Sequence, residues 1–198
     1  MEAFLRGRSP VRIGPGSPCS RRHVRALPAR PLGYAGASPC DPAAMDHRLQ
    51  PVQPQDYALI AGWLDSAAAT LRWAGPGVPY PLPPDQFEQV LQLRERPGWL
   101  LLAESGQRVG FGQAWCTEPG TMHLGRLVVA PQARGCGLGR RLVHALIEQA
   151  FQSDAVQRLT LRVYRNNAAA LALYRTLGFE PVDTASTPAL LFMQRARR

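Results

Sequence analysis

The chain has no lysine, so all 23 of its basic side chains are arginines. A nucleotide-binding loop of the Walker type needs Gly-x4-Gly-Lys-Ser/Thr, and the missing lysine excludes it. The four cysteines lie far apart, without Cys-x-x-Cys or Cys/His ligand spacing, so we expect no disulfide framework and no metal site. This cysteine usage fits a protein of the reducing cytoplasm. No run of about 18 apolar residues occurs, so we expect no membrane span.

The net charge of +9 is divided unevenly along the chain. Residues 1–44 hold seven arginines against Glu2 and Asp41, a net +5, whereas residues 45–198 hold 16 arginines against 12 acids, a net +4. Over half of the positive excess therefore lies in a short N-terminal segment. Nucleic acid is not an expected partner on this evidence, although a basic N-terminal arm stays open as an alternative.

Residues 1–44 contain seven prolines and five glycines and show neither a helical nor a strand period. Such a segment cannot bury enough apolar surface to offset its ordering entropy, so we expect it to be disordered. Met45 stands just before the first strand pattern, and residues 1–44 could also be upstream sequence from an over-long gene assignment. An organelle transit peptide is a further alternative, which the prolines argue against. We predict that residues 45–198 form the folded domain.

The chain is organised around the stretch Leu127–Leu142. It begins as a branched apolar strand, passes through a turn with glycine at 135, 137 and 139, and continues as an amphipathic helix. Glycine allows positive φ and leaves no β-carbon between the backbone amides and a ligand. A strand, a glycine turn and a helix N-terminus together form a binding site for an anion such as a pyrophosphate. A Rossmann fingerprint has different spacing, Gly-x-Gly-x-x-Gly. A tight turn without a ligand is the structural alternative.

The stretch resembles the acetyl-coenzyme A signature of the GNAT family of N-acetyltransferases, Arg/Gln-x-x-Gly-x-Gly/Ala. It is met by Arg134-x-x-Gly137-x-Gly139, and an overlapping match begins at Gln132. A second block, Leu161–Phe179, resembles the family's other motif, with Asn167 and Tyr174 at the matching positions and Gly178-Phe179 at its end. The order of helices and strands resembles that of the family over about residues 46–194, and the specific motifs lie within about residues 120–180.

The patterns predict an α/β fold. We expect strands over 48–52, 99–104, 108–116, 121–129, 159–163 and 190–194, and helices over 56–73, 85–94, 138–151 and 167–177. Asp85 is the expected N-cap of its helix. The resemblance implies a single GNAT-like domain whose central sheet is mixed, mostly antiparallel and flanked by helices.

The resemblance also implies a reaction and its residues. Acetyl-CoA would be the co-substrate and the acceptor would be a primary amine, without a metal. The cofactor would be held by the strand and loop and by one asparagine: Leu127, Val128, Val129, Arg134, Gly135, Cys136, Gly137, Leu138, Gly139, Arg140 and Asn167. Tyr174 would protonate the leaving thiolate as general acid, since a phenol stays protonated at neutral pH.

The resemblance places the general base at His123, eleven residues before Arg134. A half-buried histidine without chemistry is the alternative, and Glu118 and Glu104 are reserve candidates. Relatives that acetylate ribosomal-protein N-termini often carry a glutamate where this chain has Arg162. Because arginine cannot act as a base, we expect a small-molecule acceptor rather than a protein N-terminus.

We expect the acceptor pocket within residues 56–95, where Trp63, Trp73 and Tyr80 suggest an apolar or aromatic acceptor; these aromatics could instead belong to the core. A homodimer is left open, and no membrane partner is expected. The alternative function is a non-catalytic module that binds acyl-CoA for regulation.

Overall fold

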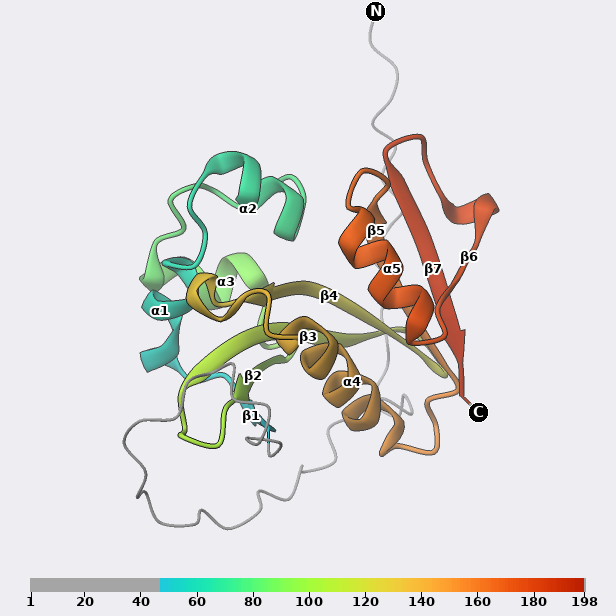
Figure 1. Ribbon diagram of the computed structural model, residues 1–198, viewed down its shortest axis with the longest axis horizontal. Helices are drawn as coiled ribbons and strands as arrows, with labels where there is room; N and C mark the ends of the chain where they lie inside the picture. The colour runs from blue at the N-terminus through green and yellow to red at the C-terminus, as the bar shows by residue number, and fades with distance from the viewer. Residues whose placement is uncertain (1–46, 198) are drawn as a thin grey trace, which may run out of the picture.

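The computed structural model describes residues 47–197, and its backbone is built around one mixed sheet (Figure 1). The strands lie in the order β1-β2-β3-β4-β5-β7-β6. Only the neighbours β4 and β5 are parallel, and every other pair is antiparallel. The strands are β1 (Arg48–Pro51), β2 (Gly98–Leu102), β3 (Arg108–Glu118), β4 (Thr121–Val129), β5 (Arg158–Tyr164), β6 (Glu180–Pro181) and β7 (Leu190–Ala196).

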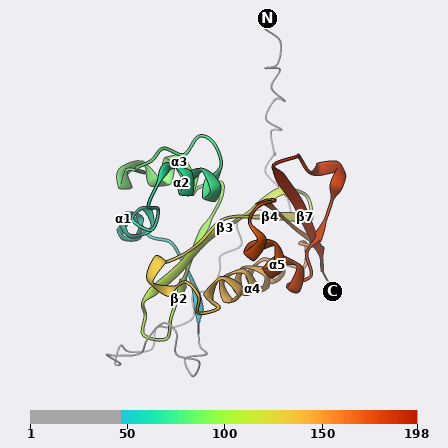
Figure 2. The ribbon, with the colours of Figure 1, turned by 45° about the horizontal axis from the view of Figure 1, so that its top comes forward.

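Helices cover the sheet on two sides (Figure 2). The first group consists of α1 (Tyr57–Ala61), α2 (Ala67–Ala74) and α3 (Phe87–Leu91), and it packs near the N-terminal strands. The second group consists of α4 (Leu138–Phe151) and α5 (Ala168–Thr176) on the other side. Four single-turn 3-10 helices, Pro54–Asp56, Pro84–Gln86, Pro131–Ala133 and Asp183–Ala185, lie in the connections between described elements.

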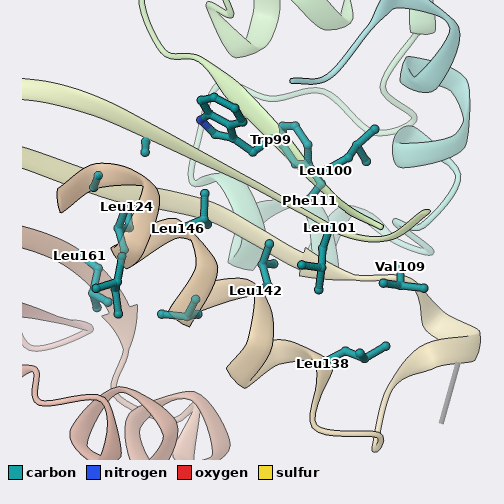
Figure 3. Packing of buried hydrophobic residues seen from close by; sticks show 14 of the residues in the cluster. Trp99, Leu100, Leu101, Val109, Phe111, Leu124, Leu138, Leu142, Leu146 and Leu161 are labelled. Carbon is teal, nitrogen blue, oxygen red and sulfur yellow. The ribbon is translucent and has the colours of Figure 1, made fainter. Parts of the chain in front are cut away.

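The core between α4 and the sheet follows from the period of both elements. Leu138, Leu142 and Leu146 recur along one stripe of α4 and are almost completely buried. They lie against Leu101, Val109 and other strand residues, while Leu124 and Leu161 continue the same layer across β4 and β5 (Figure 3). The layer fixes α4 on the sheet and so fixes the loop that precedes it.

A bulge and a divergence of strands shape the centre of the sheet. The pairing of β4 with β5 runs from Thr121 to Leu124 and then stops, although β4 continues to Val129 beside β3. Between Gly125 and Val128 the register against β3 shifts, and Arg126 adopts φ 53°, which is rare for a non-glycine residue. Beyond Leu124, the edge of β4 that faces β5 has no partner strand among the described residues.

The structure confirms the predicted fold class and most element positions, and it corrects four details. The single helix expected over 56–73 is two helices, because Gly62 ends α1 and Ser66 caps α2 through the amide of Ala69. The helix expected over 85–94 ends at Leu91, where Gln92 has φ 54°. Asp85 makes no capping hydrogen bond. Strand β6 was not predicted.

The predictions for residues 1–44 lie outside the described residues. Within the described range, no helix is long and apolar enough to cross a membrane.

Candidate functional site

The loop between β4 and α4 keeps its backbone amides available. Gly135 and Gly137 have φ of 81° and 74°, and the space that a β-carbon would fill at either position is empty of protein atoms within 4 Å. Gly137 is the N-cap of α4. The amides of Gly135, Gly137, Leu138 and Gly139 donate to no described residue. They form a set of free donors at the positive end of a helix dipole, as an anion site requires.

The side chains of the loop have separate tasks. Leu138 is 2% exposed and belongs to the core, so only its backbone can contact a ligand. Arg134 donates through Nε to the carbonyl oxygen of Val129 at 3.3 Å, and Arg140 donates through Nη1 to the hydroxyl of Thr176 in α5 at 2.9 Å. Both arginines are exposed and supply positive charge beside the free amides. Cys136 is half-buried in the same turn.

The edge of β4 leads to this loop. Leu127, Val128 and Val129 are half-buried, and they lie in the part of β4 that β5 does not cover. A strand edge without a partner presents amide and carbonyl groups that an extended amide-containing ligand can pair with. The free edge of β4 therefore presents a line of backbone amide and carbonyl groups that leads to the anion site.

Asn167 is the N-cap of α5, the helix that follows β5 in the chain. Its Oδ1 accepts a hydrogen bond from the amide of Ala170 at 3.2 Å, so the side chain caps the helix. Its Nδ2 group remains as a donor. Asn167 and Asn166 also line an opening of about 230 Å³ together with Arg72 of α2.

Tyr174 lies on α5 and is 8% exposed. Its ring packs edge-on against Phe179, with 6.0 Å between the ring centres. The hydroxyl makes no hydrogen bond to a described side chain or backbone group, and burial raises the pKa of Tyr174 to about 12. The phenol therefore stays protonated throughout the physiological range, as a general acid must before it donates.

His123 projects from β4 on the side opposite the core residue Leu124, as the alternation of a strand requires. Its ring lies 4.8 Å from the ring of Trp115 and 6.4 Å from that of Phe192. Burial, together with the positive charges of Arg162 and Arg96, lowers the pKa of His123 to about 4. This pKa lies well below the ordinary imidazole value of about 6.5, and the imidazole is neutral at pH 7.

The contacts of Thr160 favour one tautomer of the neutral imidazole. Nδ1 of His123 lies 2.9 Å from the hydroxyl oxygen of Thr160. The same hydroxyl lies 3.5 Å from the carbonyl oxygen of Met122 and donates to it. With the hydroxyl so oriented, Nδ1 carries the hydrogen and donates to Thr160, and Nε2 is free to accept a proton.

The two reserve carboxylates, Glu104 and Glu118, differ in how far they lie from His123. Glu104 is in the turn between β2 and β3, whereas Trp115, the cross-strand partner of His123, lies seven residues beyond the start of β3 at Arg108. At about 3.4 Å per residue, that is roughly 20 Å along the strand. Glu118 is exposed at the far end of β3, where it pairs with Thr121, two residues before His123 on β4. Neither packs against His123.

Sequence reasoning missed a buried polar network around the bulge. Gln113 is fully buried, and its Nε2 donates to the carbonyl oxygens of Leu91 and Arg96. Arg126 donates through Nη1 to the oxygen of Leu91 at 2.6 Å and to Oε1 of Gln113 at 2.7 Å. Burial, with Arg96 nearby, lowers the pKa of Arg126 to about 10. The network ties the end of α3 to the bulge in β4; a charged residue within an apolar strand was its only sequence signal.

The three aromatic residues expected to line the acceptor pocket have other surroundings. Trp63 is 4% exposed and belongs to the core, which contradicts that expectation for it. Trp73 is half-buried, with its ring 6.2 Å from the ring of Phe111. Tyr80 is 44% exposed and donates its hydroxyl hydrogen to the carbonyl oxygen of Asp65 at 2.8 Å. For Trp73 and Tyr80 the expectation stays a prediction.

Comparison with known proteins gives consistent results. A model of the acetyltransferase (GNAT) family matches residues 64–179. Aminoglycoside N(6')-acetyltransferase type 1 from Klebsiella pneumoniae is 29% identical over 148 residues, which are 67% of this chain and 73% of that protein. Peptidyl-lysine N-acetyltransferase YjaB from Escherichia coli is 34% identical over 92 residues, covering 44% of this chain and 52% of YjaB. The solved structure of AAC(6')-Ib with paromomycin and acetyl-CoA shares the fold, with TM-score 0.62 and 23% identity over 76% of this chain and 93% of that one.

Proposed function

Because the chain belongs to the acetyltransferase (GNAT) family, we propose that it transfers the acetyl group of acetyl-CoA to a primary amine of a small molecule. The observation that carries the proposal is the free-amide loop at the start of α4, placed at the end of the unpartnered edge of β4. Several relatives named as N-acetyltransferases of small amines support the same class of acceptor.

The two features suit the two chemically different parts of acetyl-CoA. The amides of Gly135, Gly137, Leu138 and Gly139, with Arg134 and Arg140 beside them, would hold the pyrophosphate. The edge of β4 over Leu127–Val129 would pair with the amides of the pantetheine arm. The Nδ2 group of Asn167 would donate to the same arm near its reactive end. This assignment leads the thioester toward the point where β4 and β5 diverge.

Two residues near the divergence of β4 and β5, Tyr174 and His123, would each carry out one proton transfer. The amine nitrogen attacks the thioester carbonyl carbon, a nitrogen–carbon bond forms, and the carbon–sulfur bond breaks. The departing thiolate takes a proton from Tyr174 in α5, which lies on the side of the sheet that carries α4. The attacking nitrogen loses a proton to Nε2 of His123, directly or through water, on the opposite side. Acid and base thus act from opposite sides of the reacting centre.

His123 is a weak base in the free protein. A pKa of about 4 keeps Nε2 unprotonated and able to accept, but it gives little driving force against an ammonium with a pKa of about 10. We expect the amine to enter largely as the free base, with His123 accepting the proton only as the nitrogen–carbon bond forms. The homodimer and the cytoplasmic location expected from the sequence stay predictions.

Thiol release from acetyl-CoA in the presence of a panel of amines tests the proposal, with mass spectrometry of the acceptor as the second readout. We expect thiol release that depends on one or a few amines and an acceptor that gains one acetyl group. Binding of acetyl-CoA with no release for any amine would instead support the regulatory module. No binding of acetyl-CoA would refute both functions.

A further inference from the structure

Five side chains form a row across the sheet around His123. The guanidinium carbon of Arg96 lies 4.9 Å from the ring centre of Trp115, which is the next ring to His123. On the other side of His123 lies Phe192, and the guanidinium carbon of Arg162 lies 5.8 Å from its ring centre. The row therefore runs from one arginine through three rings to a second arginine. We call it the arginine–aromatic row.

The row lies on the side of the sheet opposite to α4 and α5. Helices α4 and α5 pack on the side of Leu124 and Leu161, and strand alternation places His123 and Arg162 on the other side. Within the row His123, Trp115, Phe192 and Arg96 are half-buried and Arg162 is exposed. Arg162 and Phe192 also line a cavity of about 100 Å³, completed by Ala185, Thr187 and Leu190. A small molecule can therefore reach the end of the row that Arg162 forms.

Neither arginine of the row forms an ion pair with a described carboxylate. Asp56 is paired with Arg108, Glu88 with Arg94 and Asp154 with Arg197, whereas Arg96 and Arg162 form no such pair. Each of these two arginines instead lies over an aromatic ring, which orients a guanidinium and leaves its N–H groups available. The cavity beside Arg162 and the opening beside Arg72 are both lined without an acid.

We propose that the acceptor amine carries a carboxylate, as an amino acid does, and that Arg162 binds this carboxylate while the amine faces His123. The inference rests on the proposed function and names its substrate class. The planar guanidinium matches a carboxylate in a bidentate arrangement, and the rings of Trp115 and Phe192 provide apolar surface beside it. A polycation would bring like charge to both arginines.

The bound carboxylate also acts on the base. Arg162 and Arg96 are the charged groups that lower the pKa of His123 in the free protein. An anion held by Arg162 offsets the effect of that arginine and raises the pKa of His123 toward its ordinary value. The acceptor thereby increases the basicity of the group that takes its proton. An amine without the carboxylate binds more weakly and also meets a weaker base.

Matched pairs of acceptors test the proposal. The standard amino acids are each compared with their carboxamides, and spermidine and kanamycin serve as polycations. Calorimetric titration into the protein saturated with coenzyme A gives binding, and thiol release from acetyl-CoA gives turnover. For the preferred amino acid we expect the carboxamide to lower kcat/KM at least about tenfold, through a higher KM because a charge-assisted contact is lost and through a lower kcat because His123 stays a weaker base.

Two variants of Arg162 and one control variant test whether the loss of binding comes from the row and not from a change in folding. Arg162→Gln is expected to raise KM for the preferred amino acid about 10- to 100-fold and to remove the preference over its carboxamide, while acetyl-CoA affinity is unchanged. Arg162→Lys is expected to recover part of the preference. Arg158→Gln, an exposed position on the same strand away from the row, is the matched control and is expected to behave as the wild type.

The outcomes of these tests are distinguishable. Equal binding of amino acids and carboxamides, or better binding of spermidine or kanamycin, would overturn the inference and leave acetyl transfer standing. Binding that prefers the carboxylate and depends on Arg162, without thiol release, would support the anion site and refute the proposed function.

Discussion

The substitution Gly137→Val separates two contributions of the loop: its effect on stability and its binding of acetyl-CoA. Gly137 has φ 74°, where an L-residue costs about 1–2 kcal/mol, and no protein atom within 4 Å of the added β-carbon adds a clash. The stability loss is therefore small, a few degrees in Tm for a chain of this length. The isopropyl group occupies the space in which a pyrophosphate would approach the loop amides.

The loss of binding should be much larger than the loss of stability. Each amide bonded to a charged phosphate contributes about 1.5–3 kcal/mol, so displacing two such bonds weakens acetyl-CoA binding by roughly 100-fold or more. Isothermal titration calorimetry on the folded variant measures this affinity, and thermal unfolding measures the stability.

Gly75 provides a matched control for the same substitution. It has φ 75°, it too has no atom within 4 Å of an added β-carbon, and it ends α2 rather than beginning α4. We expect Gly75→Val to lose the same few degrees in Tm and to keep acetyl-CoA affinity. Unchanged affinity in Gly137→Val, or equal loss in the two variants, would refute the reasoning.

Three further predictions concern single residues. Tyr174→Phe should lower kcat at least about tenfold at every pH with unchanged acetyl-CoA affinity, and an unchanged kcat would remove it as the acid. NMR titration of the His123 imidazole should give a pKa of about 4 in the free protein, and a value near 6.5 would contradict the account of its surroundings. Since the unfolded chain binds that proton near pH 6.5, stability should fall as pH drops from about 6.5 to 4, and His123→Gln should lessen the fall. Arg126→Met should cost about 2–3 kcal/mol in urea unfolding, because the buried Oε1 of Gln113 loses its donor and the carbonyl oxygen of Leu91 loses one of two; Arg158→Met, at an exposed position, should cost little.

The elements that the sequence predicted best are those with strong local signals. The helix at Leu138–Phe151 and the strand at Thr121–Val129 were predicted with the observed bounds, since each has a clear apolar period and a glycine boundary. The helical period over 56–73 was real, but it crosses two short helices separated by Gly62 and capped by Ser66. A periodic pattern does not show where local hydrogen bonds divide it.

The site was predictable in its motifs and not in its surroundings. The glycine turn follows from local sequence and Asn167 from the family resemblance, and the structure gives each a local position: the turn begins α4 and Asn167 caps α5. The pKa of His123 depends on Arg96 and Arg162, which come from segments far apart in the chain and meet only across the sheet. The network of Arg126 and Gln113 depends in the same way on the end of α3. Contacts between distant segments leave no pattern in a single sequence.

Amide hydrogen exchange, measured with and without acetyl-CoA, tests the central claim most directly. Gly135, Gly137, Leu138 and Gly139 donate to no described residue and should exchange rapidly in the free protein. With acetyl-CoA bound, we predict slower exchange at these amides and at the free edge of β4 over 127–129, and little change in α1–α3. Unchanged exchange at the loop under saturating acetyl-CoA, or protection confined to another part of the molecule, would contradict the account.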